Sequence, residues 1–72
     1  NGSNDERARE HGNELVEARA LLTLGEAELA LGRHDGARLH LREALAAFQH
    51  INEPAGAATT HEVLARLLHD QG

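Results

Sequence analysis

The chain of 72 residues contains no cysteine, lysine or methionine, and Phe48 is its only aromatic side chain. The lack of cysteine excludes a disulfide framework and a thiolate metal site. With one aromatic ring, burial must come from many small aliphatic and alanine contacts, which favours closely packed helices. Apolar runs of only a few residues exclude a membrane span and the core of a signal peptide. We therefore expect a small cytoplasmic protein that does not enter a membrane.

The charge balance is acidic. Seven arginines face twelve aspartates and glutamates, which gives a formal net charge of -5 at pH 7. A surface of this sign repels phosphates, so direct nucleic-acid binding is not expected. The opening residues 1–3 resemble the remnant of a cleaved tag, which leaves residues 4–72 as one small domain. A domain of this size lies near the lower limit for a single core, so we expect neighbouring segments or partners to add packing.

Helix start and stop signals divide the chain into four helical segments. Gly12 and Asn13 supply a left-handed stop and a capping residue, which predicts that a short polar helix ends there. Asp35 is expected to cap a later helix, and Pro54 fits the first turn of the last one. The short link after Gly32 forces an antiparallel hairpin. The predicted helices span residues 5–11, 14–31, 35–50 and 54–70.

Small and apolar residues recur at fixed spacing in the middle of the chain and predict where two helix backbones pack closely. These residues are Leu24, Gly25, Gly32, Ala37, Leu41, Ala44 and Phe48. From Leu24 to Ala44 their order and spacing resemble the tetratricopeptide repeat family, a family of helical hairpins. Sliding the chain by 40 residues places Leu24 on Leu64 and Gly32 on Gly72. This long period is similar to the repeats of large bacterial regulatory and signalling proteins, including transcriptional activators.

Some positions depart from the family pattern. Leu21, Glu28 and His34 stand where the family has aromatic residues. The usual period of the family is 34 residues, shorter than the spacing in this chain. A HEAT-like or armadillo-like hairpin has a similar period and remains the structural alternative.

The resemblance implies an all-α fold of TPR-like α-solenoid type, with three main helices plus a short N-terminal helix. It also implies a protein–protein interaction module that binds a peptide or helix, from another protein or from its own parent chain, on its concave face. The residues expected on that face are Arg19, Leu22, Glu26, Leu29, Thr59, Glu62, Arg66 and His69. The alternative function is homo-oligomerisation, in which the exposed end helices pair with a second copy to form a homodimer.

The six histidines and the paired acids do not predict a chemical site. No two histidines are four residues apart, the spacing of a helical metal pair. Glu26 and Glu28 project from different helix faces, so they cannot share one substrate proton. The only serine, Ser3, lies in the predicted tag remnant, and there is no glycine-rich phosphate loop. We therefore expect no catalysis, no cofactor and no metal. Three histidines near predicted helix C-termini complement the helix dipole, namely His11, His50 and His69.

Overall fold

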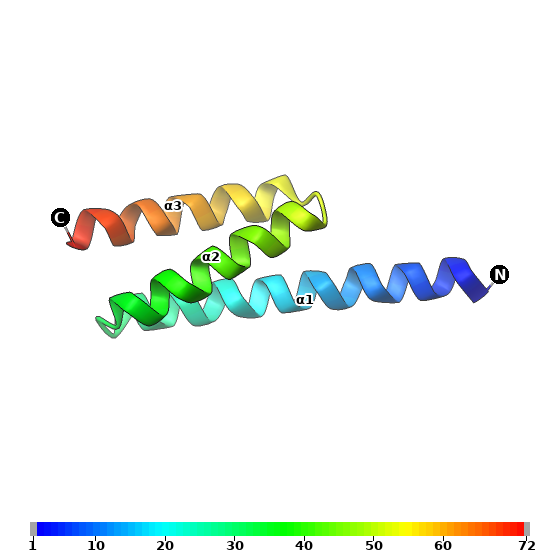
Figure 1. Ribbon diagram of the computed structural model, residues 1–72, viewed down its shortest axis with the longest axis horizontal. Coiled ribbons are helices and arrows are strands. Elements are labelled where there is room, and N and C mark those ends of the chain that lie inside the picture. Colours follow the sequence, from blue (N-terminus) through cyan, green and yellow to red (C-terminus); the bar gives the residue numbers. More distant parts are fainter. Residues whose placement is uncertain (1, 72) are drawn as a thin grey trace.

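The computed structural model describes residues 2–71, and the surroundings of side chains for residues 6–70. Within this part of the chain all regular secondary structure is helical: α1 spans Gly2–Ala30, α2 His34–His50 and α3 Pro54–Gln71. In Figure 1, α2 runs antiparallel to α1, and α3 turns back to run in the same direction as α1. The predicted all-α class with three main helices is confirmed. Residue 1 of the proposed tag remnant lies outside the described residues.

The corner between α1 and α2 is closed by backbone hydrogen bonds around a left-handed glycine. Gly32 has φ +77°, which a glycine adopts without steric cost. The amide N–H of Arg33 donates to the carbonyl oxygen of Glu28 at 2.8 Å, and the N–H of Gly32 donates to that of Leu29 at 3.0 Å. This pair of bonds is a Schellman motif, which satisfies carbonyls at the end of a helix. The predicted glycine turn after the second predicted helix is therefore confirmed.

The corner between α2 and α3 repeats this arrangement 20 residues later. Asn52 takes the place of Gly32, with φ +54°. Asparagine is one of the few residues that tolerate this region of backbone conformation. The amide N–H of Glu53 donates to the carbonyl oxygen of Phe48 at 2.8 Å. Pro54 then opens α3, as its fixed φ and missing N–H predict.

Two expectations about helix ends are wrong. Residues 5–11 do not form a separate helix, because α1 continues through Gly12 and Asn13. An interior glycine costs a helix about 1 kcal/mol relative to alanine, which does not end a helix by itself. Asp35 lies in the first turn of α2 and does not cap it, since Arg33 occupies the N-cap position without a side-chain hydrogen bond. His11 consequently lies inside α1, whereas His50 and His69 lie in the last turns of α2 and α3.

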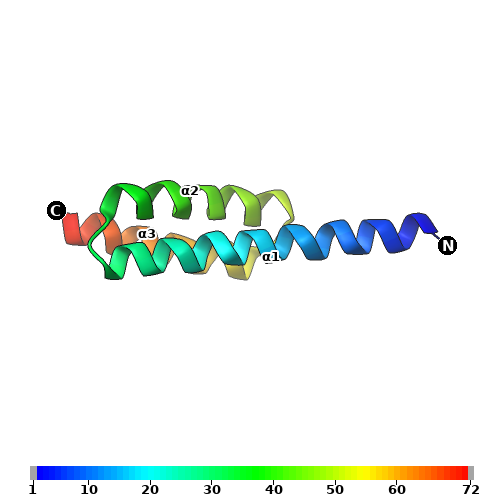
Figure 2. The same cartoon turned by 90° about the horizontal axis from the view of Figure 1, so that it is seen from below.

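The N-terminal part of α1 extends beyond the other two helices. Residues 6–13 are all exposed, and a Cβ on Gly12 would meet nothing within 4 Å. Both views show this segment projecting past the α2–α3 corner (Figures 1 and 2). The packed body of the described chain therefore consists of the rest of α1 with α2 and α3.

The core lies along the face of α2 that meets the other helices. One cluster of buried residues joins α2 to α3 and comprises Ala37, Leu41, Val63 and Leu67. A second joins α1 to α2 and comprises Ala18, Ala44 and Phe48. Gly25 lets α1 approach α2 closely, because a Cβ there would lie 2.6 Å from Cδ2 of Leu41. Thr60 is also buried, and its hydroxyl donates to the carbonyl oxygen of Gly56 at 2.8 Å.

Most residues of the small-residue pattern lie where two helices meet. Gly25, Ala37, Leu41, Ala44 and Phe48 are all buried. Leu24 departs from this expectation, since its side chain is 44% exposed. It lies on the side of α1 that points away from α2, one helical step from the buried Gly25.

Candidate functional site

α1 carries a row of exposed apolar side chains opposite its packed face. We call this row the α1 stripe; it consists of Val16, Ala20, Leu24, Ala27 and Leu31. Val16 and Leu31 are 67% and 69% exposed. The spacing of four, four, three and four residues keeps the row on one side of a 3.6-residue helix. The opposite side of the same helix, around Ala18 and Gly25, is buried.

A helix that is apolar on two opposite sides is typical of a position between two packing layers. In the described chain only one of these layers is present, formed by α2 and α3 (Figure 2). A row of exposed aliphatic side chains of this length is also typical of a surface that binds another polypeptide. The α1 stripe is therefore the first candidate interaction surface.

A groove of about 450 Å³ between α2 and α3 is the second candidate surface. We call it the α2–α3 groove. Its most exposed apolar side chain is Leu68, at 62%. No acidic side chain lines it, although the chain as a whole has a net charge of -5. The lining residues are Arg38, Arg42, Leu45, His61, Leu64, Ala65, Leu67 and Leu68.

The eight residues expected on the concave face divide into two groups. Leu22 and Leu29 are half-buried and pack against the core clusters, so part of their surface stabilises the fold. Thr59 is exposed, and its hydroxyl donates to the carbonyl oxygen of Ala55 at 3.1 Å. The charged and imidazole side chains of the set are also exposed: Arg19, Glu26, Glu62, Arg66 and His69. The helices that carry the eight residues, α1 and α3, lie on the same side of α2 (Figure 2).

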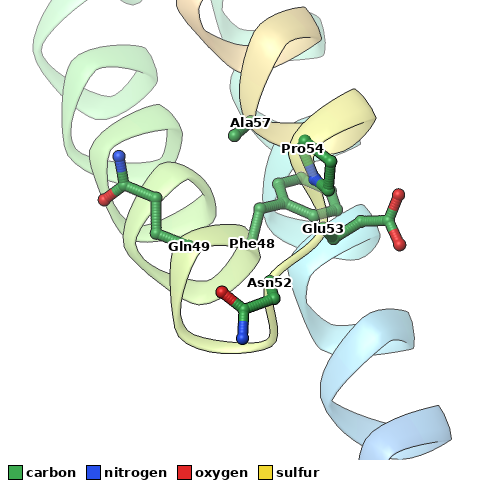
Figure 3. A pocket seen from close by; sticks show the side chains of 6 residues that line it. All are labelled: Phe48, Gln49, Asn52, Glu53, Pro54 and Ala57. Carbon is green, nitrogen blue, oxygen red and sulfur yellow. The ribbon is translucent and has the colours of Figure 1, made fainter.

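A shallow pocket of about 490 Å³ lies at the α2–α3 corner. Figure 3 shows the ring of Phe48 next to Pro54, while the carboxylate of Glu53 and the amide of Gln49 point away from the ring. Phe48 is only 2% exposed, and a Cβ on Gly56 would overlap its ring. Because the polar groups do not converge, this pocket offers no arrangement for catalysis. Its residues close the corner.

One polar contact between helices was not anticipated from the sequence. The Glu28 carboxylate on α1 contacts Nδ1 of His40 on α2, with the two side chains 15% and 26% exposed. Gly36 makes room for this contact, because a Cβ there would overlap the Glu28 carboxylate. The signal in the sequence was the spacing of Gly36 and His40, four residues apart on one face of α2. The pair has no neighbouring nucleophile and connects the two helices.

A second pair between α1 and α2 is more exposed. Nε2 of His50 lies 3.8 Å from a carboxylate oxygen of Glu14. The side chains of His50 and Glu14 are 78% and 44% exposed. Exposed pairs at such a distance contribute little to stability.

Other kinds of site find no support in the described part of the chain. No group of three or more histidine, aspartate or glutamate side chains among the described residues is placed to hold a metal ion. No helix within residues 2–71 has the length and apolarity required to cross a bilayer. Comparisons of the chain with protein-family models, with curated proteins and with solved structures found no match.

Proposed function

We propose that this chain is a protein–protein interaction module of TPR-like α-solenoid type, acting within a larger regulatory protein in the bacterial cytoplasm. The observation that carries the proposal is the α1 stripe, an exposed apolar row on a helix whose other face is packed. Binding a polypeptide is the function that such a surface supports best. The proposal assigns no catalytic step to the chain.

The repeated corners also support a solenoid. The hydrogen bonds around Gly32 recur around Asn52 after 20 residues, so each further pair of helices would restore the direction of the chain after 40. Stacked units with a fixed repeat build extended concave surfaces, which such proteins use for binding. A helix at the end of an excised array has an outer face that a neighbouring unit would cover. The α1 stripe fits this position.

The proposed binding face lies along α1 and α3. It combines Arg19 and Glu26 on α1 with Glu62 and Arg66 on α3, all exposed. Mixed charges beside half-buried leucines suit an amphipathic helix or an extended peptide better than a strongly charged tail. We propose that the ligand contacts these exposed side chains while Leu22 and Leu29 support them from below.

Self-association is the second candidate, and the exposure of Leu24 and Leu31 favours it. In this alternative, the α1 stripes of two copies bury one another. A two-fold contact of this kind is isologous, so the same residues would be covered in both copies.

The test is a selection of peptides from a display library that contains both helical and extended sequences. We expect the selected peptides to lose at least about ten-fold in affinity when Arg19→Glu and Arg66→Glu are combined. The matched control is Asp35→Asn together with Glu43→Gln, on the exposed side of α2. A library that yields no specific ligand, together with sedimentation as a monomer at every concentration, would overturn both candidate functions.

A further inference from the structure

We infer that the α2–α3 groove binds an acidic amphipathic helix of a protein partner. This inference rests on the proposed interaction function and adds a second surface with a defined partner chemistry. It is independent of the α1 stripe and of the proposed α1–α3 binding face, because the groove lies between the other pair of helices.

The floor of the groove is apolar. Leu45 and Leu64 are half-buried there, and Leu68 is 62% exposed at the rim. Leu67 lies beneath and is fully buried in the core cluster, so the floor rests on packed side chains. An aliphatic side chain of a partner would therefore meet a preformed apolar surface, which is the usual condition for binding a helix in a groove.

The rim of the groove is basic. Arg38 and Arg42 lie one helical turn apart on α2, and His61 lies on α3. The absence of acidic lining residues reverses the sign of charge found over the chain as a whole. Guanidinium groups form charge-assisted hydrogen bonds with carboxylates, and an imidazole N–H donates in either protonation state. Charge complementarity therefore selects a partner with aspartate or glutamate beside its apolar residues.

The length of the groove selects a helix. Its walls extend from Arg38 to Leu45 on α2 and from His61 to Leu68 on α3, about two turns or 10–12 Å on each helix. Apolar residues at positions i, i+4 and i+7 of a partner helix span about the same distance. Such a ligand would bring one acidic side chain within reach of each arginine in successive turns.

The probe is a synthetic amidated helix of about 18 residues, with leucines at positions i, i+4 and i+7 and flanking glutamates. Its matched control has the same leucines and lysine in place of every glutamate. We expect the acidic probe to bind at least about ten-fold more tightly than the lysine probe, measured by fluorescence anisotropy. The difference should shrink as salt is added, because screening weakens exposed charge pairs.

Variants then locate the probe. Arg42→Glu should weaken the acidic probe and strengthen the lysine probe, since the charge at the rim is reversed. Leu68→Asp should abolish binding of both, and the exposure of Leu68 allows this variant to fold, which circular dichroism checks. Leu24→Asp, on the α1 stripe, is the control and should leave binding unchanged.

The inference fails if the two probes bind equally, if neither binds, or if Arg42→Glu has no effect. It also fails if Leu24→Asp removes binding, because the probe would then occupy the α1 stripe. The proposed function survives these outcomes when library peptides still depend on Arg19 and Arg66. If those peptides are also absent, both proposals fall together.

Discussion

The ring of Phe48 lies against the backbone of Gly56, at the corner where α2 leads into α3. The same relationship occurs 20 residues earlier, where the carboxylate of Glu28 lies against the backbone of Gly36. In both corners the side chain belongs to the residue whose carbonyl accepts the longest-range hydrogen bond of the turn. The glycine in the next helix leaves space for it. The two corners are therefore alike in backbone and in packing, although one holds an aromatic ring and the other a carboxylate.

Gly56→Ala is expected to destabilise the fold. The new methyl group would overlap the ring of Phe48, which is 2% exposed and has little room to move. Overpacking of this kind costs about 1–3 kcal/mol, more than the gain of about 1 kcal/mol in helix propensity. Urea unfolding followed by circular dichroism measures the difference. Unchanged or increased stability would mean that Phe48 does not pack against α3 in this way.

Gly12→Ala is the matched variant and is expected to act in the opposite direction. Residue 12 lies inside α1 with nothing within 4 Å of a new Cβ. Alanine should therefore raise the helix content of the N-terminal segment, with a gain of up to about 1 kcal/mol. A loss of helix signal in circular dichroism would show instead that Gly12 adopts the left-handed turn.

The contact between Glu28 and His40 is expected to stabilise the α1–α2 pair. Because both side chains are largely buried, a double-mutant cycle with Glu28→Gln and His40→Asn should give a coupling of about 0.5–1 kcal/mol. The Glu14–His50 pair, which is more exposed and 3.8 Å apart, is the control. It should show no measurable coupling. Equal coupling in the two cycles would contradict the role given to burial.

Charges placed on the α1 stripe are expected to reduce self-association without unfolding the chain. Leu24→Asp combined with Leu31→Asp removes the two exposed leucines of the stripe. Because exposed substitutions away from the core change stability little, the unfolding midpoint should stay close to that of the parent chain. Sedimentation equilibrium measures the association. Dimerisation that persists in the double variant would place the contact on another surface.

The helix boundaries that the sequence predicts best are those with two agreeing signals. Gly32 follows an apolar helical stripe and is followed by residues that pack on the preceding helix. Pro54 removes a donor that the first turn of α3 does not need. Gly12 is the same residue type as Gly32, but the exposed residues before it, 6–11, have no helix to pack on. Without that packing there is no gain from forming a turn.

The candidate surfaces were harder to predict than the helices. α1 has apolar residues on two sides, so periodicity alone did not show that Gly25 faces the core while Leu24 faces outward. The contact between Glu28 and His40 depends on the relative position of two helices, which local pattern does not contain. The α2–α3 groove combines residues from helices 54–71 and 34–50 for the same reason.

The most direct test of the account maps a selected library peptide onto the chain through amide chemical shifts in nuclear magnetic resonance. The account expects saturable shifts concentrated on the exposed sides of α1 and α3, around Arg19, Glu26, Glu62 and Arg66. Shifts confined to the α2–α3 corner around Asn52, or weak shifts spread evenly over the chain without saturation, would contradict the claim that the packed helices form a scaffold for another polypeptide.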